Sequence, residues 1–274
     1  MLALPDYAEL HCVSNFSFLR GASHAEELVA RAQELGYTAL AITDECSFAG
    51  LVRAHGAAKA VGMRLICGSE ITLADGMKLV LLAQNRAGYG NLSAIVSLGR
   101  RHAEKGCYHL TRGDLLPGIP DCLALWVAPA GASPDDARWL AGAFPARAWI
   151  AFERHLAPDD AERLAALRAL SEASGLPLVA AGDVHMHVRG RRALQDVLVA
   201  LRLKTSVDAA GHALGTLCLM DTAPRAFDER EKRLLQAMAN DLMAGWRDAQ
   251  AAGGPALPAG QAAPSATVGQ VVPQ

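Results

Sequence analysis

The chain has no strong excess of charge of either sign. Its 26 Lys and Arg residues stand against 28 Asp and Glu residues, which gives a net charge of -2. A chain this close to neutral has no global positive field to hold nucleic acid. We therefore expect any contact with DNA to be indirect, through a partner protein.

Paired cysteines and long apolar runs are also missing. The six cysteines form no C-x-x-C pair, which argues against a zinc ribbon and against a disulfide framework. The amino terminus has no basic segment followed by a long apolar run, and no window is long and apolar enough to span a bilayer. These absences predict a cytoplasmic protein with reduced thiols and no membrane partner.

What the chain does have is an alternation of strand-like and helix-like segments up to about residue 205. With 274 residues and 51% hydrophobic composition, it is long enough for one α/β barrel or two small domains. After a short strand that leads into His11, we expect strands at 39–43, 64–67, 78–83, 123–127, 146–152 and 178–181. We expect helices at 23–35, 48–61, 89–101, 158–174 and 190–203. This alternation predicts parallel β/α units, closed or open.

The first expected helix carries clear end signals. Ser23 is placed to be its N-cap, and Glu26 three residues later would complete a capping box. Gly36 follows the last apolar position and predicts the helix end.

Acidic and histidine side chains follow several of the expected strands. In a β/α barrel the carboxyl ends of the strands share one rim, so such residues converge there. Carboxylates and imidazoles are ligands that suit Mn, Zn or Fe, and such clusters are typical of metal phosphoesterases. The candidate metal ligands are His11, Asp44, Glu70, Asp183 and His185.

Simpler explanations exist for some of these residues. Asp44 is equally suited to capping the helix that follows it. Asp183 and His185 form a D-x-H pair, which places both side chains on the same side of an extended backbone and favours a joint role. One of His102 and His109 is a further candidate ligand, whereas His187 is expected to be solvated.

One stretch of the chain is concentrated in basic residues. It either contacts phosphates or forms a solvated helix face, and we favour the solvated face. Its members are Arg189, Arg191, Arg192, Arg202 and Lys204.

The character of the chain changes after about Lys204. Residues 215–221 predict a short strand, and residues 228–231 form a second capping box before an amphipathic helix that reaches Trp246. Residues 251–274 carry no charge and are rich in Ala, Gly and Pro, so we expect a disordered tail. The expected domains are therefore 1–205, 206–250 and 251–274.

Five phrases of the chain together resemble one family. They are H-C-V-S-N-F-S-F-L-R-G-A-S from His11, A-I-T-D-E-C-S-F-A-G from Ala41, G-S-E-I from Gly68, L-L-A-Q-N-R-A-G-Y-G-N-L from Leu81 and A-A-G-D-V-H-M-H-V-R from Ala180. They resemble the PHP (polymerase and histidinol phosphatase) domain of bacterial DNA polymerase III alpha subunits. The resemblance is greatest to the second, error-prone alpha subunit of damage-induced mutagenesis, over about residues 3 to 205. It implies a distorted, TIM-like seven-stranded β/α barrel.

Two positions depart from the metal-binding pattern of that family. The first motif, H-x-H, has Val13 at its second histidine, and the second motif, D-H, has Glu45 after Asp44. Val13 cannot bind a metal, whereas Glu45 can. The resemblance therefore implies a weakened site for Mn, Zn or Mg at the five candidate ligands, with Glu45 as a further one. No catalytic residue is assigned, and the domain is expected to act as a scaffold.

The family's polymerase active site lies in a palm domain that follows the PHP domain. This chain changes character where the palm would begin, so we expect no polymerase activity from the chain alone. The expected partners are the remainder of a polymerase or other replication and mutagenesis proteins.

The segment from Gly211 to Glu231 has a resemblance of its own. It is similar to the last strand and final helix of a GAF sensory domain. Its amphipathic helix is expected either to self-associate through residues 228–246 or to pack on the barrel.

Three functions follow from these observations. The first is a structural PHP fragment of an error-prone DNA polymerase. The second is a metal-dependent phosphoesterase of the PHP type, and the third is a signalling fragment that dimerises through the GAF-like helix.

Overall fold

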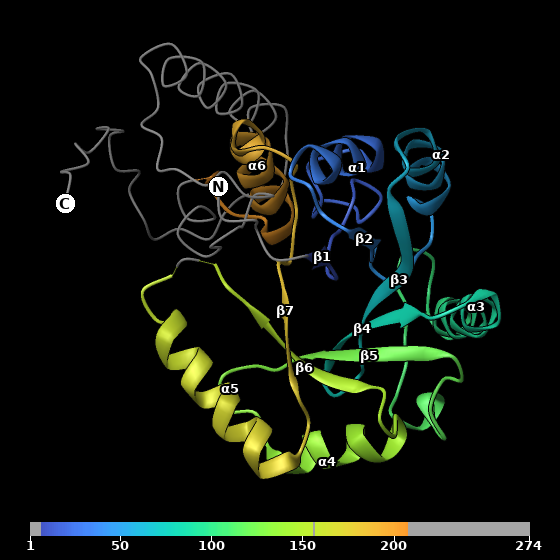
Figure 1. Cartoon of the computed structure of the whole chain (residues 1–274), viewed down its shortest axis with the longest axis vertical. Helices are drawn as coiled ribbons and strands as arrows, with labels where there is room; N and C mark the ends of the chain where they lie inside the picture. The colour runs from blue at the N-terminus through green and yellow to red at the C-terminus, as the bar shows by residue number, and fades with distance from the viewer. Residues whose placement is uncertain (1–6, 156, 208–274) are drawn as a thin grey trace, which may run out of the picture. The chain divides into compact units, whose positions relative to one another are not determined.

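The computed structural model describes residues 7–155 and 157–207, which form seven strands and six α-helices (Figure 1). The strands are β1 (Ala8–Glu9), β2 (Ala39–Ile42), β3 (Arg64–Thr72), β4 (Lys78–Ala83), β5 (Cys122–Val127), β6 (Ala148–Glu153) and β7 (Leu178–Ala181). The helices are α1 (Ala25–Glu34), α2 (Leu51–Val61), α3 (Arg86–Arg101), α4 (Pro134–Ala143), α5 (Asp160–Ser174) and α6 (Arg192–Leu203), with 3₁₀ turns η1 (Gly113–Leu115) and η2 (Arg189–Arg191). The predicted GAF-like remnant, beyond residue 207, and the predicted disordered tail lie outside the described residues.

The seven strands form one sheet in sequence order, from β1 to β7. All neighbouring pairs are parallel except those of β4, which runs antiparallel to both β3 and β5. The prediction of parallel units is therefore wrong for β4. Only residues 73–77 separate β3 from β4, and a parallel crossover needs a dozen or more residues.

The two ends of the sheet meet beyond β1 and β7. Cys12 and Val184 form an isolated parallel bridge. The amide of Val13 donates to the Val184 carbonyl at 2.9 Å, and the amide of Val184 donates to the His11 carbonyl at 2.9 Å. These bonds nearly close the sheet, and they confirm the predicted distorted seven-stranded barrel.

Alternate residues of each strand face opposite sides of the sheet. In β4, Leu79 and Leu81 belong to a core shared with the helices, whereas Val80 and Leu82 belong to an inner cluster contributed by several strands. This two-residue period is the ordinary geometry of a strand that is buried on both faces. On the outside, α1 lies beside α2 and α4 lies beside α5 (Figure 1).

Two sequence predictions about helices need correction. The N-cap of α1 is His24 rather than Ser23, and the capping-box carboxylate is Glu27, which accepts from the His24 amide at 2.9 Å. The Ser23 hydroxyl instead forms a hydrogen bond with the ring of His187 at 2.7 Å.

Helix α4 was not predicted, although Ser133 followed by Pro134 is a typical helix start. The predicted end at Gly36 is confirmed, with φ of 73° at that glycine.

A buried carboxylate also fastens the two ends of the sheet together. Glu9 is 2% exposed, and its Oε1 accepts from the amides of His11 and Gly182, both at 2.9 Å. Its Oε2 accepts from the Tyr7 hydroxyl at 2.9 Å. Burial raises the pKa of Glu9, and the backbone amides of His11 and Gly182 oppose that rise.

We expect Glu9→Ala to lower the free energy of unfolding by about 2 kcal/mol or more, because two buried amides lose their acceptor. Glu9→Gln keeps an oxygen for both amides and should cost less than about 1 kcal/mol. Urea unfolding of the two variants beside the wild type measures this difference. Equal losses in the two variants would show that the carboxylate does not join the ends of the sheet.

Candidate functional site

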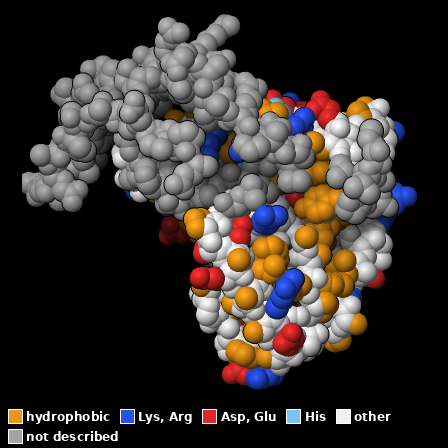
Figure 2. Space-filling view, turned by 60° about the vertical axis from the view of Figure 1, so that its left-hand side comes forward, with side chains coloured by type: hydrophobic (Ala, Val, Ile, Leu, Met, Phe, Trp, Pro, Cys, Tyr) orange, Lys and Arg blue, Asp and Glu red, His pale blue; other side chains and the backbone are white. Residues whose placement is uncertain are grey.

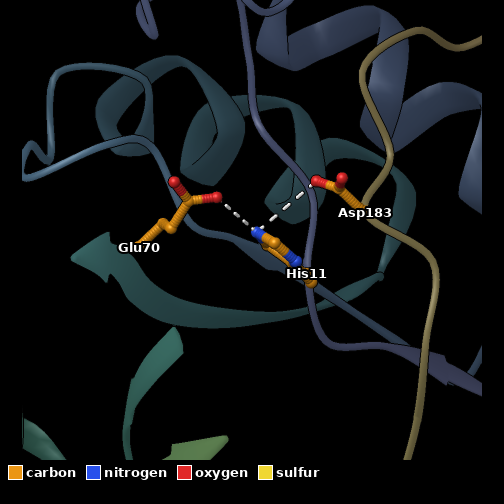
Figure 3. A group of neighbouring side chains, drawn as sticks. All are labelled: His11, Glu70 and Asp183. Atoms are coloured by element: carbon orange, nitrogen blue, oxygen red, sulfur yellow. Dashed lines mark hydrogen bonds and ion pairs between the residues drawn. The ribbon is translucent and has the colours of Figure 1, made fainter. Parts of the chain in front are cut away.

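The centre of the candidate site is the imidazole of His11, which is 0% exposed. His11 lies two residues beyond β1. Its Nε2 is 2.8 Å from Glu70 Oε2 and 3.7 Å from Asp183 Oδ1, and its Nδ1 is 2.6 Å from Glu153 Oε1. Figure 3 shows the ring between the carboxylates of Glu70 and Asp183. Three carboxylates from distant parts of the chain therefore surround one histidine.

The strand arrangement explains this convergence. Glu153 is the last residue of β6, and Asp183 lies two residues beyond β7. Glu70 lies inside β3, because that strand continues to Thr72 instead of ending near residue 67 as predicted. Glu70 pairs with Val80 of β4, whose side chain is in the inner cluster, so the Glu70 side chain shares that face.

His11, Glu70 and Asp183 form a group that can hold a metal ion. One ligand atom from each lies within 4.8 Å of the other two. Glu153, His155 and Asp183 form a second group that meets the same distance test. Asp183 joins both groups and has a φ of 48°, a backbone conformation that is unusual for a residue other than glycine and is often found at functional sites.

The charges around His11 change the pKa values of the whole group. Burial alone would lower the pKa of His11, but Asp183, Glu153 and Glu70 raise it well above its usual value. Burial would raise the pKa of Glu70, yet hydrogen bonds from Arg20 and His11 lower it strongly. Burial would also raise the pKa of Asp183, but His185 and His11 lie close to its carboxylate and lower that pKa well below its usual value. The neighbouring carboxylates therefore favour the protonated form of the His11 ring.

Arg20 is an unpredicted member of the site. Its side chain donates to both oxygens of Glu70, at 2.5 Å and 2.8 Å, and to Glu45 Oε2 at 2.9 Å. Lys78 adds a second positive group, with its Nζ 3.6 Å from Glu70 Oε2. Glu45, the predicted additional ligand, also accepts from the Tyr108 hydroxyl at 3.1 Å.

Asp44 lies outside both groups. Its oxygens accept from the Ser14 amide and hydroxyl, each at 2.8 Å, and from the Ser17 hydroxyl at 2.8 Å. Burial raises the pKa of Asp44, and these serine contacts oppose the rise. In the described residues Asp44 ties the loop after β1 to the end of β2, and its role as a metal ligand stays a prediction.

His185 is buried next to the group without belonging to it. Its Nε2 is 2.9 Å from Asp183 Oδ1, and its Nδ1 is 3.2 Å from Gln195 Nε2 of α6. His185 thus orients the Asp183 carboxylate. A histidine that holds a ligand carboxylate in this way is common around metal sites.

The remaining predicted positions are placed as follows. Val13 is 0% exposed, and its apolar side chain offers no ligand atom. His102 and His109 are exposed and lie outside both groups. His187, expected to be solvated, is instead half-buried against Ser23 because its ring hydrogen-bonds that hydroxyl.

Two members of the site were missed at the sequence level. Glu153 had a usable signal, because it directly follows the apolar residues of β6 just as the other candidates follow their strands. The sequence signal for Arg20 was weaker, because it consists only of Arg20 being the one Lys or Arg between His11 and Ser23. Its partner Glu70 is 50 residues away, so the pair is visible only in the structure.

Comparison with known families finds a match for part of the chain. The family described as "PHP domain" matches residues 9–120, which include His11, Arg20 and Glu70 but not Glu153 or Asp183. Residues 9–120 belong to a PHP domain.

The PHP domain of this chain has close relatives in one kind of protein. The "Error-prone DNA polymerase" of Dechloromonas aromatica is 62% identical, over 78% of this chain and 21% of that protein. That of Azoarcus sp. is 53% identical, over 78% of this chain and 23% of that protein. The chain therefore spans about a fifth of the length of these relatives.

A solved structure is also similar to the chain. It is described as a putative metal-dependent phosphoesterase from Bifidobacterium adolescentis and is 14% identical, with a TM-score of 0.48 over 66% of this chain and 88% of its own. A likeness at this level carries no inference about function.

Two further observations concern the distribution of charged side chains and the apolar character of the helices. On the face drawn in Figure 2, the described Lys and Arg side chains lie scattered among apolar and acidic ones. Within residues 7–155 and 157–207, no helix has the length and apolar character needed to cross a membrane.

We expect His11→Ala to lower the free energy of unfolding by about 3 kcal/mol or more, because it leaves the buried carboxylates of Glu70 and Glu153 without their shared partner. His102→Ala, at an exposed position, is the matched control and should change it by no more than about 0.5 kcal/mol. Urea unfolding measures both. A loss in His11→Ala no larger than in the control would show that the histidine does not hold the carboxylates together.

Proposed function

We propose that the chain acts as a structural PHP module of an error-prone DNA polymerase and transfers no nucleotide by itself. The observation that carries this proposal is the 62% identity to such a polymerase over 78% of this chain. The chain spans only about a fifth of that relative, and its proposed role is to support the palm-bearing remainder of such a polymerase. Contact with DNA would then be made by that remainder, in the cytoplasm.

The chemistry of the site supports a structural role. Both oxygens of Glu70 accept hydrogen bonds from Arg20, and both nitrogens of His11 contact carboxylates. Val13 stands where the family pattern has a histidine. Groups that are already bound to each other stabilise a fold, whereas a phosphoesterase needs them free to hold metal ions and water.

The proposal includes a weakened metal site. Its ligands would be His11, Glu70 and Asp183, with Asp44, His185 and Glu45 as further predicted ligands. Imidazole and carboxylate donors suit Mn or Zn, and carboxylates suit Mg, so these are the three ions we propose. When bound, such an ion would supply Lewis acidity and an activated water.

A second candidate function is a metal-dependent phosphoesterase of the PHP type. The group of His11, Glu70 and Asp183 favours it, because its ligand atoms lie within 4.8 Å of one another. The occupied hydrogen bonds of that group favour the structural role instead.

The domain limits also remain proposals. We place the PHP domain at 1–205, the GAF-like remnant at 206–250 and the tail at 251–274. Self-association through residues 228–246 rests on the sequence pattern, since this segment lies outside the described residues.

Binding to a polymerase that lacks its own PHP segment tests the proposed function. The probe is the Dechloromonas aromatica polymerase with the segment that matches this chain removed. We expect this chain and the shortened polymerase to co-elute in size-exclusion chromatography, because the remainder exposes the surface on which its own segment packs.

The intact Dechloromonas aromatica polymerase is the control, since its own segment already covers that surface. Co-elution with the shortened protein alone supports the structural role. No co-elution with either protein would contradict it, as would metal-dependent phosphodiester hydrolysis by this chain that is lost in Asp183→Ala.

A further inference from the structure

Arg20 is a buried charged side chain that pairs with two carboxylates beside the candidate metal group. It is 6% exposed, although arginine is rarely buried without partners. Two of its nitrogens form a fork on the two oxygens of Glu70, and one of them also reaches Glu45. A bidentate arginine–carboxylate pair is among the strongest and most directional ion pairs in proteins.

The guanidinium acts on the same atom that a metal ion would use. Glu70 Oε2, which is 2.8 Å from His11 Nε2, is also 2.8 Å from Arg20 Nη2. The oxygen that links Glu70 to His11 is therefore already shared with a positive charge. Arg20 also bridges Glu70 and Glu45, as a metal ion bridges two carboxylates.

The loop that carries Arg20 is built to hold it in this position. The Arg20 amide donates to the Ser17 carbonyl at 2.9 Å, and the Ser17 hydroxyl is fixed by Asp44 at 2.8 Å. A Cβ at Gly21 would lie 2.0 Å from the Ser14 carbonyl oxygen, so only glycine allows the turn to close this tightly. The backbone of the turn that carries Arg20 is thus held by these hydrogen bonds and by the close approach at Gly21.

Positive side chains already face the carboxylates of the group. Arg20 pairs with Glu70 and Glu45, and the Lys78 Nζ lies 3.6 Å from Glu70 Oε2. A divalent ion at Glu70 would meet direct repulsion from the guanidinium.

We propose that Arg20 is the resident cation of this site, holding Glu70 and Glu45 together in place of a metal ion and weakening the binding of divalent ions at His11, Glu70 and Asp183. The inference deepens the proposed structural function and rests on it. It follows that added metal does not change the stability of the wild-type chain, and that strong metal binding requires the loss of the Arg20 charge.

Three forms of the full 274-residue chain test the proposal: the wild type, Arg20→Met and Arg20→Lys. Each is dialysed against MnCl2 or ZnCl2, and the metal content and the thermal unfolding midpoint are measured. Arg20→Met removes the charge at similar volume. Arg20→Lys keeps the charge but loses the fork, and it is the matched control.

The wild type should hold well below one ion per chain, with the same midpoint with and without metal. Arg20→Met should unfold about 5 °C or more below the wild type without metal, because it leaves two acidic groups unpaired. It should then bind close to one ion per chain and recover most of that loss with Mn²⁺ or Zn²⁺. Arg20→Lys should remain without metal.

Two results would overturn the proposal. One is a stoichiometric ion in the wild type that raises its midpoint, and the other is an Arg20→Met variant that binds no more metal than the wild type. If Arg20→Met is insoluble when made without metal, it and Arg20→Gln are made with Mn²⁺ present, and failure of both to fold then also counts against the proposal. Stoichiometric metal in the wild type would reject only the proposed role of Arg20 and would leave the structural function standing. Failure of the co-elution experiment would reject the structural function.

Discussion

The hydrogen bonds that join the segment after β1 to the segment after β7 are the constraint on which the rest of the structure depends. Cys12 and Val184 pair there, and Glu9 binds the amide of Gly182. Without this junction the sheet would be an open array, and Asp183 would lie at one edge while His11 lay at the other. The closure of the barrel is therefore also the event that assembles the candidate site.

The site combines two kinds of buried charge. Around Asp44, serine hydroxyls and an amide satisfy a carboxylate with neutral donors. Around Glu70, Arg20 donates from a charged guanidinium and the His11 ring contacts the same carboxylate. The buried charge of Glu70 is thus compensated by a cation, whereas that of Asp44 is compensated by neutral hydrogen-bond donors. The result around Glu70 is a compact network of buried ion pairs, which supports the proposed structural role.

Much of this was available from the sequence, and the rest depended on contacts between distant residues. The strands, most helices and the convergence of His11, Glu70 and Asp183 follow from apolar runs that end in polar residues. The antiparallel direction of β4 was overlooked, although the short connection after β3 already required it. Glu153 was missed although it follows the apolar residues of its strand just as the other candidates follow theirs. Arg20 could not be predicted as a site residue, because its carboxylate partners are distant in the sequence and contact it only in the folded chain. Whether Asp44, His185 and Glu45 bind metal stays a prediction.

The long sequence separation of the closing contacts has a consequence for the order of events during synthesis. His11 meets Glu153 across 142 residues, and Ser23 meets His187 across 164. Contacts of such high order form late and slowly in folding. Until β7 and the residues after it have been synthesised, Cys12 lacks its bridge partner Val184 and His11 lacks Asp183. The junction between the two ends of the sheet is therefore among the last contacts that the growing chain can form.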